Sequence, residues 1–591
     1  MIILPAMAEP ARTSGYRFGI FELKMNERQL LVGSQAVALG PRAFDVLVAL
    51  VERAGGLVTK EELLARVWPD LVVEENNLQV QVSALRKILG QQAIATIPGR
   101  GYRFTAALTG VNAAGAGSTL LAQIDDTVQS IAVLPFVNMS DDAANEYFAD
   151  GISEELLNVL SKIRGLRVAS HTSAFSFKGG KVDIPTVAQK LNVATILEGS
   201  VRKVGKRVRI TVQLVEAATD SHLWSDTYDR ELEDIFAVQD DIAQSVVKEL
   251  RSALLGEKLN PAARAAVTAE VRVAAKGRGE NPEAHRLYLQ GRVLVARSTQ
   301  QGVTTGIEYF TQAVTLDPDH ALAWAALAFA RTVEAGSGGW APYKEGYGRA
   351  REAAERALAL EPDLAEGHMA LACVRRGYDW DWSGADASAR RALELAPGNA
   401  EVVLAAAAVA GGLGRFDESI ALCRRAIALD PLSVRAHRAL GLNSLFGGLP
   451  EQAETALQEA LELDPLTGMT HAGLGNVYLE QHRFEEALAA FEKESVDGFR
   501  LLGLSVALHA LGRSAASSAA LEQLSELPAH KYLNAQARAY RGEVDQAFEW
   551  LERAYVQRNA GLSQLKVQPL LRNLHGDPRW QIFLKKIRLA D

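Results

Sequence analysis

Residues 74–104, EENNLQVQVSALRKILGQQAIATIPGRGYRF, determine the fold of the N-terminal part of the chain. Four apolar residues recur at i, i+4, i+7 and i+11, which predicts an amphipathic helix over residues 74–89. These core-facing residues are Leu78, Val82, Leu85 and Leu89. Residues 93–97 and 102–104 then flank the segment Pro98-Gly-Arg-Gly101, which predicts a β-hairpin with a tight tip.

The opposite face of this predicted helix is suited to contact nucleic acid. It gathers amides, hydroxyls and small apolar groups, which can contact base edges and thymine methyls, and cations that can neutralise phosphates. The helical residues that we expect to contact DNA are Asn76, Asn77, Gln79, Val80, Ser83, Ala84, Arg86 and Lys87.

The hairpin adds further positive charge. Four basic residues and no acidic residue lie between Ser83 and Arg103, although the whole chain has a formal net charge of −8. Arg100 stands between two glycines, where its guanidinium could enter a minor groove. Tyr102 and Arg103 complete the predicted DNA contacts. A DNA site in such an acidic chain has to be local.

Two further helices precede this segment. One is expected over residues 41–53, beginning with Pro41, and a second follows the predicted capping box of Thr59 and Glu62 and ends at Trp68. Together these elements predict an α+β winged helix-turn-helix domain over residues 15–106.

This domain resembles the OmpR/PhoB-type winged helix of transcriptional regulators. The resemblance rests on Tyr16-Arg-Phe-Gly, Phe21-Glu-Leu, Val58-Thr-Lys-Glu-Glu-Leu-Leu, Val67-Trp68, Leu85-Arg-Lys-Ile-Leu and Gly99-Arg-Gly-Tyr-Arg-Phe104. It implies that the 74–89 helix enters the major groove of double-stranded DNA and that the hairpin contacts the neighbouring backbone. We expect neither a receiver domain before it nor the membrane helix of the CadC- and ToxR-like branch after it. A winged helix used only for protein contacts is the alternative.

A flexible linker is predicted over residues 107–126, because this segment is rich in glycine, alanine and serine. The pattern of residues 127–255 then predicts a small α/β domain. We expect strands over 130–138, 166–170 and 222–228, a hairpin over 194–217, and helices over 146–163, 184–191 and 235–254. The motifs Ile131-Ala-Val-Leu-Pro-Phe, Phe148-Ala-Asp-Gly-Ile-Ser and Leu197-Glu-Gly-Ser-Val-Arg resemble a module of FlgO- and TolB-N-like proteins, which also occurs in some class III adenylate cyclases.

A polar segment over 256–280 is expected to separate this domain from an all-α repeat array over 281–591. Five prolines end alanine-rich helices at positions 318, 362, 397, 431 and 465, at spacings of 44, 35, 34 and 34 residues. A period of 34 residues is that of the tetratricopeptide repeat. We expect seven or eight units, an inserted loop over 336–348, and atypical repeats at the C-terminal end.

The remaining composition excludes several classes of protein. The two cysteines, Cys373 and Cys423, fall at packing positions of the repeats, so neither a disulfide framework nor a zinc site of several thiolates is expected. No stretch is apolar over the length of a membrane span, and we expect a cytoplasmic protein. No phosphate-binding loop, HExxH motif or nucleophile elbow occurs, so we expect no catalytic residues, no metal and no cofactor.

These patterns indicate a sequence-specific DNA-binding transcriptional regulator whose repeats bind a signal or a protein or peptide partner. Dimerisation on DNA stays open. The alternative function is a tetratricopeptide scaffold that binds DNA weakly.

Overall fold

The structure of the 591-residue chain is a computed structural model, in which two units are distinct, residues 1–125 and 126–591. The described residues are 15–18, 21–24, 28–32, 35–37, 39–51, 57–68, 73, 75–89, 93–97, 101–104, 108–111, 129–140, 146–163, 166–179, 183–231, 235–255, 261–296, 299–337, 340–527 and 529–589.

The first unit begins with an antiparallel sheet in the order β4-β3-β2-β1-β8. Its strands are β1 (Gly15–Phe18), β2 (Phe21–Lys24), β3 (Gln29–Val32), β4 (Gln35–Val37) and β8 (Leu108–Val111). Strand β8 lies within the segment that was predicted to be a flexible linker. It pairs with β1, Tyr16 opposite Val111, so the domain extends beyond residue 106. The linker residues 112–126 lie outside the described residues.

Three helices and a second sheet complete this unit. The helices are α1 (Pro41–Val51), α2 (Lys60–Val67) and α3 (Glu75–Leu89), and the sheet has the order β5-β7-β6, with β5 (Leu57–Thr59), β6 (Ile94–Ile97) and β7 (Gly101–Phe104). The capping box predicted before α2 is present, since the Glu62 amide donates to Thr59 Oγ1 at 3.2 Å and the Thr59 amide donates to Glu62 Oε2 at 2.9 Å. The α+β winged-helix fold is confirmed.

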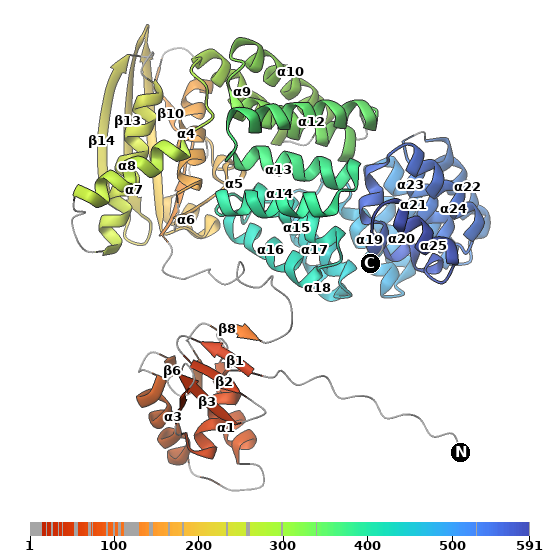
Figure 1. The fold of residues 1–591 in the computed structure, drawn as a ribbon, viewed down its shortest axis with the longest axis horizontal. Helices are drawn as coiled ribbons and strands as arrows, with labels where there is room; N and C mark the ends of the chain where they lie inside the picture. The colour runs from red at the N-terminus through yellow and green to blue at the C-terminus, as the bar shows by residue number, and fades with distance from the viewer. Residues whose placement is uncertain are drawn as a thin grey trace. The chain divides into compact units, whose positions relative to one another are not determined.

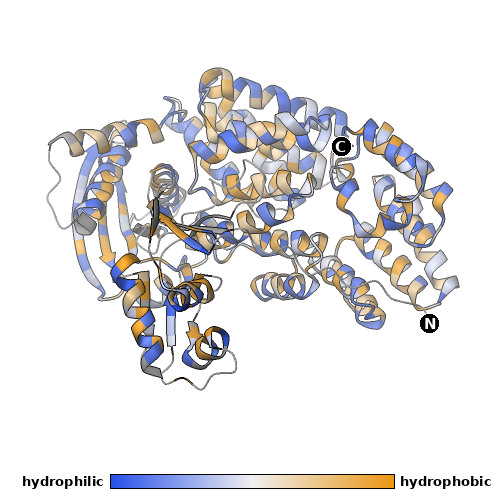
Figure 2. Cartoon of the chain, turned by 60° about the horizontal axis from the view of Figure 1, so that its bottom comes forward, coloured by the Kyte–Doolittle hydropathy of each residue, from blue (hydrophilic) through white to orange (hydrophobic). Residues whose placement is uncertain are grey.

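The second unit begins with a mixed sheet in the order β11-β9-β12-β13-β14, with β10 pairing β12 (Figure 1). The strands are β9 (Gln129–Val133), β10 (Val137–Asn138), β11 (Leu166–Val168), β12 (Thr195–Val204), β13 (Arg207–Glu216) and β14 (Ser221–Glu231). Strands β11, β9 and β12 are parallel, and β12, β13 and β14 are antiparallel. Apolar and polar residues alternate along β13 (Figure 2), so successive side chains of this strand face opposite sides of the sheet.

Helices cover both faces of this sheet. On one face, α4 (Glu146–Ser161), α7 (Ile235–Leu255) and α8 (Pro261–Ala274) pack on side chains such as Ile131 and Val133. On the other face, α6 (Ile184–Leu191) packs on Ala132 and Ile196, and the short helix α5 (His171–Phe175) follows β11. Helix α8 lies in the segment predicted to be a polar separator. That prediction was wrong, because Val267 and Val271 of this helix are buried in the core of the α/β domain.

The all-α repeat fold is also confirmed. In the described part of residues 281–591, the helices from α9 to α24 form eight antiparallel pairs, in agreement with seven or eight predicted units. The pairs are α9 (Pro282–Ala296) with α10 (Gln300–Leu316), α11 (Ala321–Thr332) with α12 (Tyr343–Leu360), α13 (Ala365–Val374) with α14 (Trp382–Leu395), α15 (Ala400–Gly412) with α16 (Phe416–Leu429), α17 (Val434–Phe446) with α18 (Pro450–Leu463), α19 (Thr470–Glu480) with α20 (Phe484–Glu492), α21 (Asp497–Ala510) with α22 (Ser514–Glu526), and α23 (Lys531–Tyr540) with α24 (Val544–Val556).

The predicted insertion over 336–348 is largely helical. A π-helical turn, Val333–Ser337, continues α11, and α12 already begins at Tyr343. Tyr343 and Tyr347 are buried there, which explains why this segment is helix and not a solvated loop. At the C-terminal end, two 3₁₀ helices (Ala560–Val567 and Pro569–Leu574) and α25 (Pro578–Lys586) cover the last repeat.

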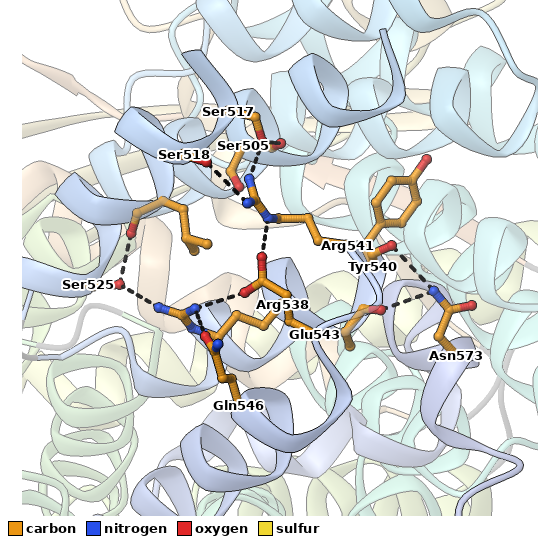
Figure 3. Close-up of polar contacts among 12 residues, drawn as sticks. Ser505, Ser517, Ser518, Ser525, Arg538, Tyr540, Arg541, Glu543, Gln546 and Asn573 are labelled. Atoms are coloured by element: carbon orange, nitrogen blue, oxygen red, sulfur yellow. Dashed lines mark hydrogen bonds and ion pairs between the residues drawn. The ribbon is translucent and has the colours of Figure 1, made fainter. Parts of the chain in front are cut away.

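Arginine side chains connect the last repeats (Figure 3). Arg541 Nε donates to Glu543 Oε1 at 2.7 Å and its guanidinium also contacts Ser517, while Arg538 Nη1 donates to Glu543 Oε2 at 2.9 Å. Ser517 Oγ in turn donates to the Ser505 carbonyl at 2.6 Å. The carboxylate of Glu543 thus binds two guanidinium groups. Through the contact of Arg541 with Ser517, this network connects α23 and α24 to α21 and α22.

The α/β domain is docked on one surface of the repeat array, which we call the inner surface. This surface is formed by the first helices of the first five pairs, α9, α11, α13, α15 and α17, and α4 lies between it and the sheet (Figure 1). Arg167 Nη1 donates to the Ala428 carbonyl at 2.9 Å, and Ser173 Oγ accepts from the Leu432 amide at 3.1 Å. Because the first helices of five successive pairs converge on this domain, the array curves around it.

Candidate nucleic-acid interface

Helix α3 has one face in the core of the winged helix. Leu78, Val82 and Leu85 are buried, and Leu89 is half-buried against the same cluster. Helix α1 packs against this face and so orients α3. The apolar spacing in the sequence therefore determines which side of α3 is left for solvent.

The predicted contact residues lie mostly on the exposed side of α3. Asn77, Gln79, Ser83 and Lys87 are exposed, and Val80 is 56% exposed. Ala84 is half-buried and lies one residue after Ser83. An exposed valine among amides and a hydroxyl is the combination that can contact thymine methyls and base edges together.

Two predicted residues cannot be placed. Asn76 is in α3, but its side chain lies outside the described residues, as does all of Arg100 together with Pro98 and Gly99. Their assignment to DNA contact stays a prediction.

Arg86 has a positioning role in the structure. Its Nε and Nη2 atoms donate to the Ile94 carbonyl at 3.0 and 2.6 Å, and Nη2 also donates to Thr96 Oγ1 at 2.7 Å. The guanidinium thereby connects α3 to the first strand of the hairpin. Sequence reasoning missed Thr96, an exposed residue of β6, although a hydroxyl so close to the basic hairpin tip was the available signal.

Tyr102 is not available to DNA, which contradicts its predicted role. The side chain is 5% exposed and belongs to the core cluster with Phe104. The reason is the alternation along β7, which places residues 102 and 104 on the core face and leaves Arg103 exposed. Arg103 and Lys87 are thus the exposed cations among the predicted residues that the structure describes.

Gly101 allows strands β7 and β5 to lie close together. It pairs with Thr59 of β5, and a Cβ on Gly101 would overlap with the Val58 carbonyl oxygen. The glycine therefore allows the hairpin to pack against the strand that precedes α2.

In the part of the chain that the structure describes, no group of three or more His, Cys, Asp or Glu side chains could hold a metal ion. Among the described helices, none is long and apolar enough to cross a membrane.

Comparison with protein families assigns three segments. Residues 34–104 match the family "Transcriptional regulatory protein, C terminal". Residues 127–245 match "HilA/YgeH-like transcriptional regulator, second domain", and residues 404–445 and 438–497 match the tetratricopeptide repeat. The chain therefore contains an OmpR/PhoB-type winged helix, a HilA-like regulator domain and tetratricopeptide repeats.

Characterised relatives share parts of the chain. The putative adenylate cyclase 3 of Rhizobium meliloti is 39% identical over 199 residues, which are 34% of this chain and 32% of that protein. The transcriptional regulator HilA of Salmonella typhimurium is 33% identical over 141 residues, 23% of this chain and 24% of that protein. The transcriptional regulatory protein CutR of Streptomyces coelicolor is 37% identical over 89 residues, 15% of this chain and 41% of that protein. The chain thus spans less than half the length of each of these relatives.

Among solved structures, the DNA-binding domain of Escherichia coli CadC is similar to 17% of this chain and covers 98% of its own, with 27% identity and a TM-score of 0.16. The DNA-binding domain of Klebsiella pneumoniae RstA, solved with the RstA box, is similar to 15% of this chain, with 28% identity and a TM-score of 0.14.

Proposed function

We propose that this chain is a sequence-specific DNA-binding transcriptional regulator that acts in the cytoplasm without catalysis of its own. The winged helix binds promoter DNA, with α3 in the major groove and the β6–β7 hairpin against the adjacent backbone or minor groove. The HilA-like domain and the repeats receive a signal or a protein partner.

The two faces of α3 carry this proposal. One face is fixed in the core by Leu78, Val82 and Leu85, while Val80 and Ser83 lie on the solvent side beside Lys87. A helix held rigidly by one face and exposing base-contacting groups on the other meets the requirement for direct contact with a groove. Asn76, Asn77, Gln79, Ala84, Arg100 and Arg103 complete the proposed contact set, with Arg86 acting as both a phosphate contact and a support of the hairpin.

The test measures affinity and sequence preference of the full chain with separate variants. Ser83→Ala should reduce the discrimination between bases at one position of the DNA site by about 1–3 kcal/mol, because it removes a base contact. Lys87→Ala and Arg103→Ala should weaken binding to all sequences alike and lower the slope of log affinity against log salt by about 1 each. Arg100→Ala should have the same effect on the slope.

The matched control is Arg230→Ala, which removes an exposed arginine from β14 in the second unit. If this control changes the salt slope as much as Lys87→Ala does, the proposed interface is wrong. If the preferred sequence is unchanged by both Ser83→Ala and Asn76→Ala, α3 is not the base-contacting element.

The alternative, a repeat scaffold that binds DNA weakly, has less support. Five of the eight repeat pairs direct their first helices at the chain's own α/β domain, so an extended peptide or helix would have to compete with that domain for the inner surface. Deletion of the winged helix separates the two functions: a regulator then loses its genomic binding sites, whereas a scaffold keeps its partners and its cellular effect.

A further inference from the structure

A cavity of about 370 Å³ lies between the α/β domain and the inner surface of the repeats. One wall comes from α4 and the segment 168–171, and the other walls come from α9, α10, α11, α13, α15, α17 and the turn before α17. This volume corresponds to roughly a dozen water molecules and falls within the usual range of small-molecule sites, which favour domain interfaces.

The cavity is lined by charged groups, so it is not a dry packing defect. Glu154 is 2% exposed and Asp430 is 5% exposed, and Arg292, Arg435 and Glu401 also line the space. Cavities that stay empty are apolar, and buried charges require polar partners or water. This lining therefore suits a polar occupant better than an apolar one.

The ion pairs at the wall are loose. Arg292 Nε lies 3.4 Å from Glu154 Oε1, and Arg435 Nη1 lies 3.6 Å from Glu401 Oε1. These distances exceed those of a charge-assisted hydrogen bond, which are about 2.7–2.9 Å. The guanidinium and carboxylate groups of these pairs thus keep capacity to bind a ligand of the opposite charge.

The rest of the lining is apolar. The guanidinium of Arg435 stacks over the ring of Phe329, 5.8 Å from its centroid. The other apolar side chains of the lining are Leu157, Val168, Val295, Phe310, Leu322, Met369 and Leu404. The cavity thus offers both signs of charge next to an aliphatic and aromatic surface.

We propose that this cavity binds a small zwitterion with an apolar body, an α-amino acid with an aliphatic or aromatic side chain. The ligand carboxylate binds Arg435 or Arg292, whose planar guanidinium groups suit carboxylates. The ligand ammonium binds Glu401, and the side chain contacts the apolar lining. A bound ligand contacts both the α/β domain and the repeats and therefore stabilises their docking.

The first test is titration calorimetry on the full chain without DNA, with L-leucine and L-phenylalanine as probes. We expect saturable binding of at least one of them at millimolar or lower concentration, and an upward shift of the unfolding temperature of the second unit. Phenethylamine lacks the carboxylate and 3-phenylpropionate lacks the ammonium, so each should bind at least tenfold more weakly than L-phenylalanine. Equal binding of either analogue, or no binding of both amino acids, would overturn the proposal.

Variants locate the site. Arg435→Gln should weaken binding at least tenfold, because it removes the guanidinium that binds the ligand carboxylate; since the Arg435 side chain is 41% exposed, we expect the variant to fold. The matched control, Arg424→Gln, changes an exposed arginine of α16 that does not line the cavity and should bind normally. Equal affinity of the two variants would place the ligand elsewhere. This test involves no DNA, so its outcome is independent of the function proposed for the winged helix.

Discussion

Gly101 lies where the backbones of β7 and β5 approach each other closely. Besides its overlap with the Val58 carbonyl, a Cβ on this residue would lie 2.8 Å from Thr59 Cα. Backbone atoms cannot move aside as a flexible side chain can, so only glycine fits without displacing a strand.

We predict that Gly101→Ala destabilises the winged helix by about 1–3 kcal/mol, the usual effect of overpacking. Chemical denaturation of the full chain, followed by a probe in the first unit, measures the change. Gly40→Ala is the control, because no atom lies within 4 Å of a Cβ on Gly40. Equal stability of the two variants would show that β5 and β7 are not packed as described.

Glu155 is a buried charge at the junction of α4 and the repeats. Its carboxylate lies 3.4 Å from Arg278 Nη1 and 3.3 Å from His285 Nε2. Burial alone would raise the pKa of Glu155, but His285 and Arg278 lower it to about 2. The carboxylate is therefore ionised in the folded protein and compensates the charge of Arg278.

We predict that Glu155→Ala destabilises the second unit by about 1–3 kcal/mol, because it removes the buried carboxylate that faces His285 and Arg278, while Arg278 keeps its ion pair with Asp240 at 2.7 Å. Glu283→Ala breaks an ion pair with Arg286 at the surface of α9 and should cost no more than about 1 kcal/mol. Urea denaturation of both variants measures the difference. Similar costs would contradict the burial of the Glu155 pair.

At the scale of elements, α3 and the hairpin that follows it act as one body because Arg86 connects them. The guanidinium satisfies the Ile94 carbonyl and Thr96 Oγ1 together. We predict that Arg86→Ala costs about 1.5–3 kcal/mol of stability, the range for hydrogen bonds to charged groups. It should also weaken DNA binding to all sequences alike, since the hairpin loses its support.

Unfolding and fluorescence anisotropy measurements test the effect of Arg86→Ala. The control is Arg86→Lys, which keeps the charge but not the fork of donors. If Arg86→Lys restores binding fully, the charge and not the connection matters.

The elements that the sequence predicted correctly have strong local signals. Helix α2 is bounded by a capping box, and helix α6 has the predicted bounds, Ile184–Leu191, with Pro185 in its first turn. The 34-residue proline spacing likewise predicted the helix pairs from α13 to α18.

The elements that were missed depend on contacts distant in the chain. Strand β8 exists through its pairing with β1 almost a hundred residues away, and no alternation marks it in the sequence. Helix α8 was missed although its sequence is rich in alanine and valine, because the charged residues on either side of it dominated the interpretation of the segment; Val267 and Val271 of this helix face the core. The DNA contacts were also difficult to predict from sequence alone. Tyr102 and Arg103 are equally plausible contacts by residue type, but the alternation along β7 buries the side chain of Tyr102 and exposes that of Arg103.

At the scale of the whole molecule, Glu154 makes the docking of the α/β domain on the repeats sensitive to pH. Burial raises the pKa of Glu154 from 4.5 to about 7, while Arg292 opposes that rise. A carboxyl with a raised pKa binds its proton more tightly in the folded state. Its contribution to stability is therefore complete below about pH 4.5 and is lost as the pH rises through 7.

We predict that the second unit loses up to about 3 kcal/mol of stability from this group between pH 5 and pH 8. In Glu154→Gln this part of the pH dependence should disappear, whereas Glu249→Gln on α7 should keep it. Denaturation curves of the three proteins at several pH values decide the matter. A Glu154→Gln variant with the wild-type pH profile would assign the effect to another group.

The docking on the inner surface also determines which outside molecules can compete for it. The α/β domain is covalently joined to the repeats, so its local concentration at that surface is of millimolar order. A free peptide that binds the inner surface with the same intrinsic affinity would need a similar concentration to displace the α/β domain in half of the molecules. Only a ligand that binds much more tightly, or one that weakens the docking first, can open the surface at the concentrations of a cell, and occasional weak binders are excluded by the chain itself.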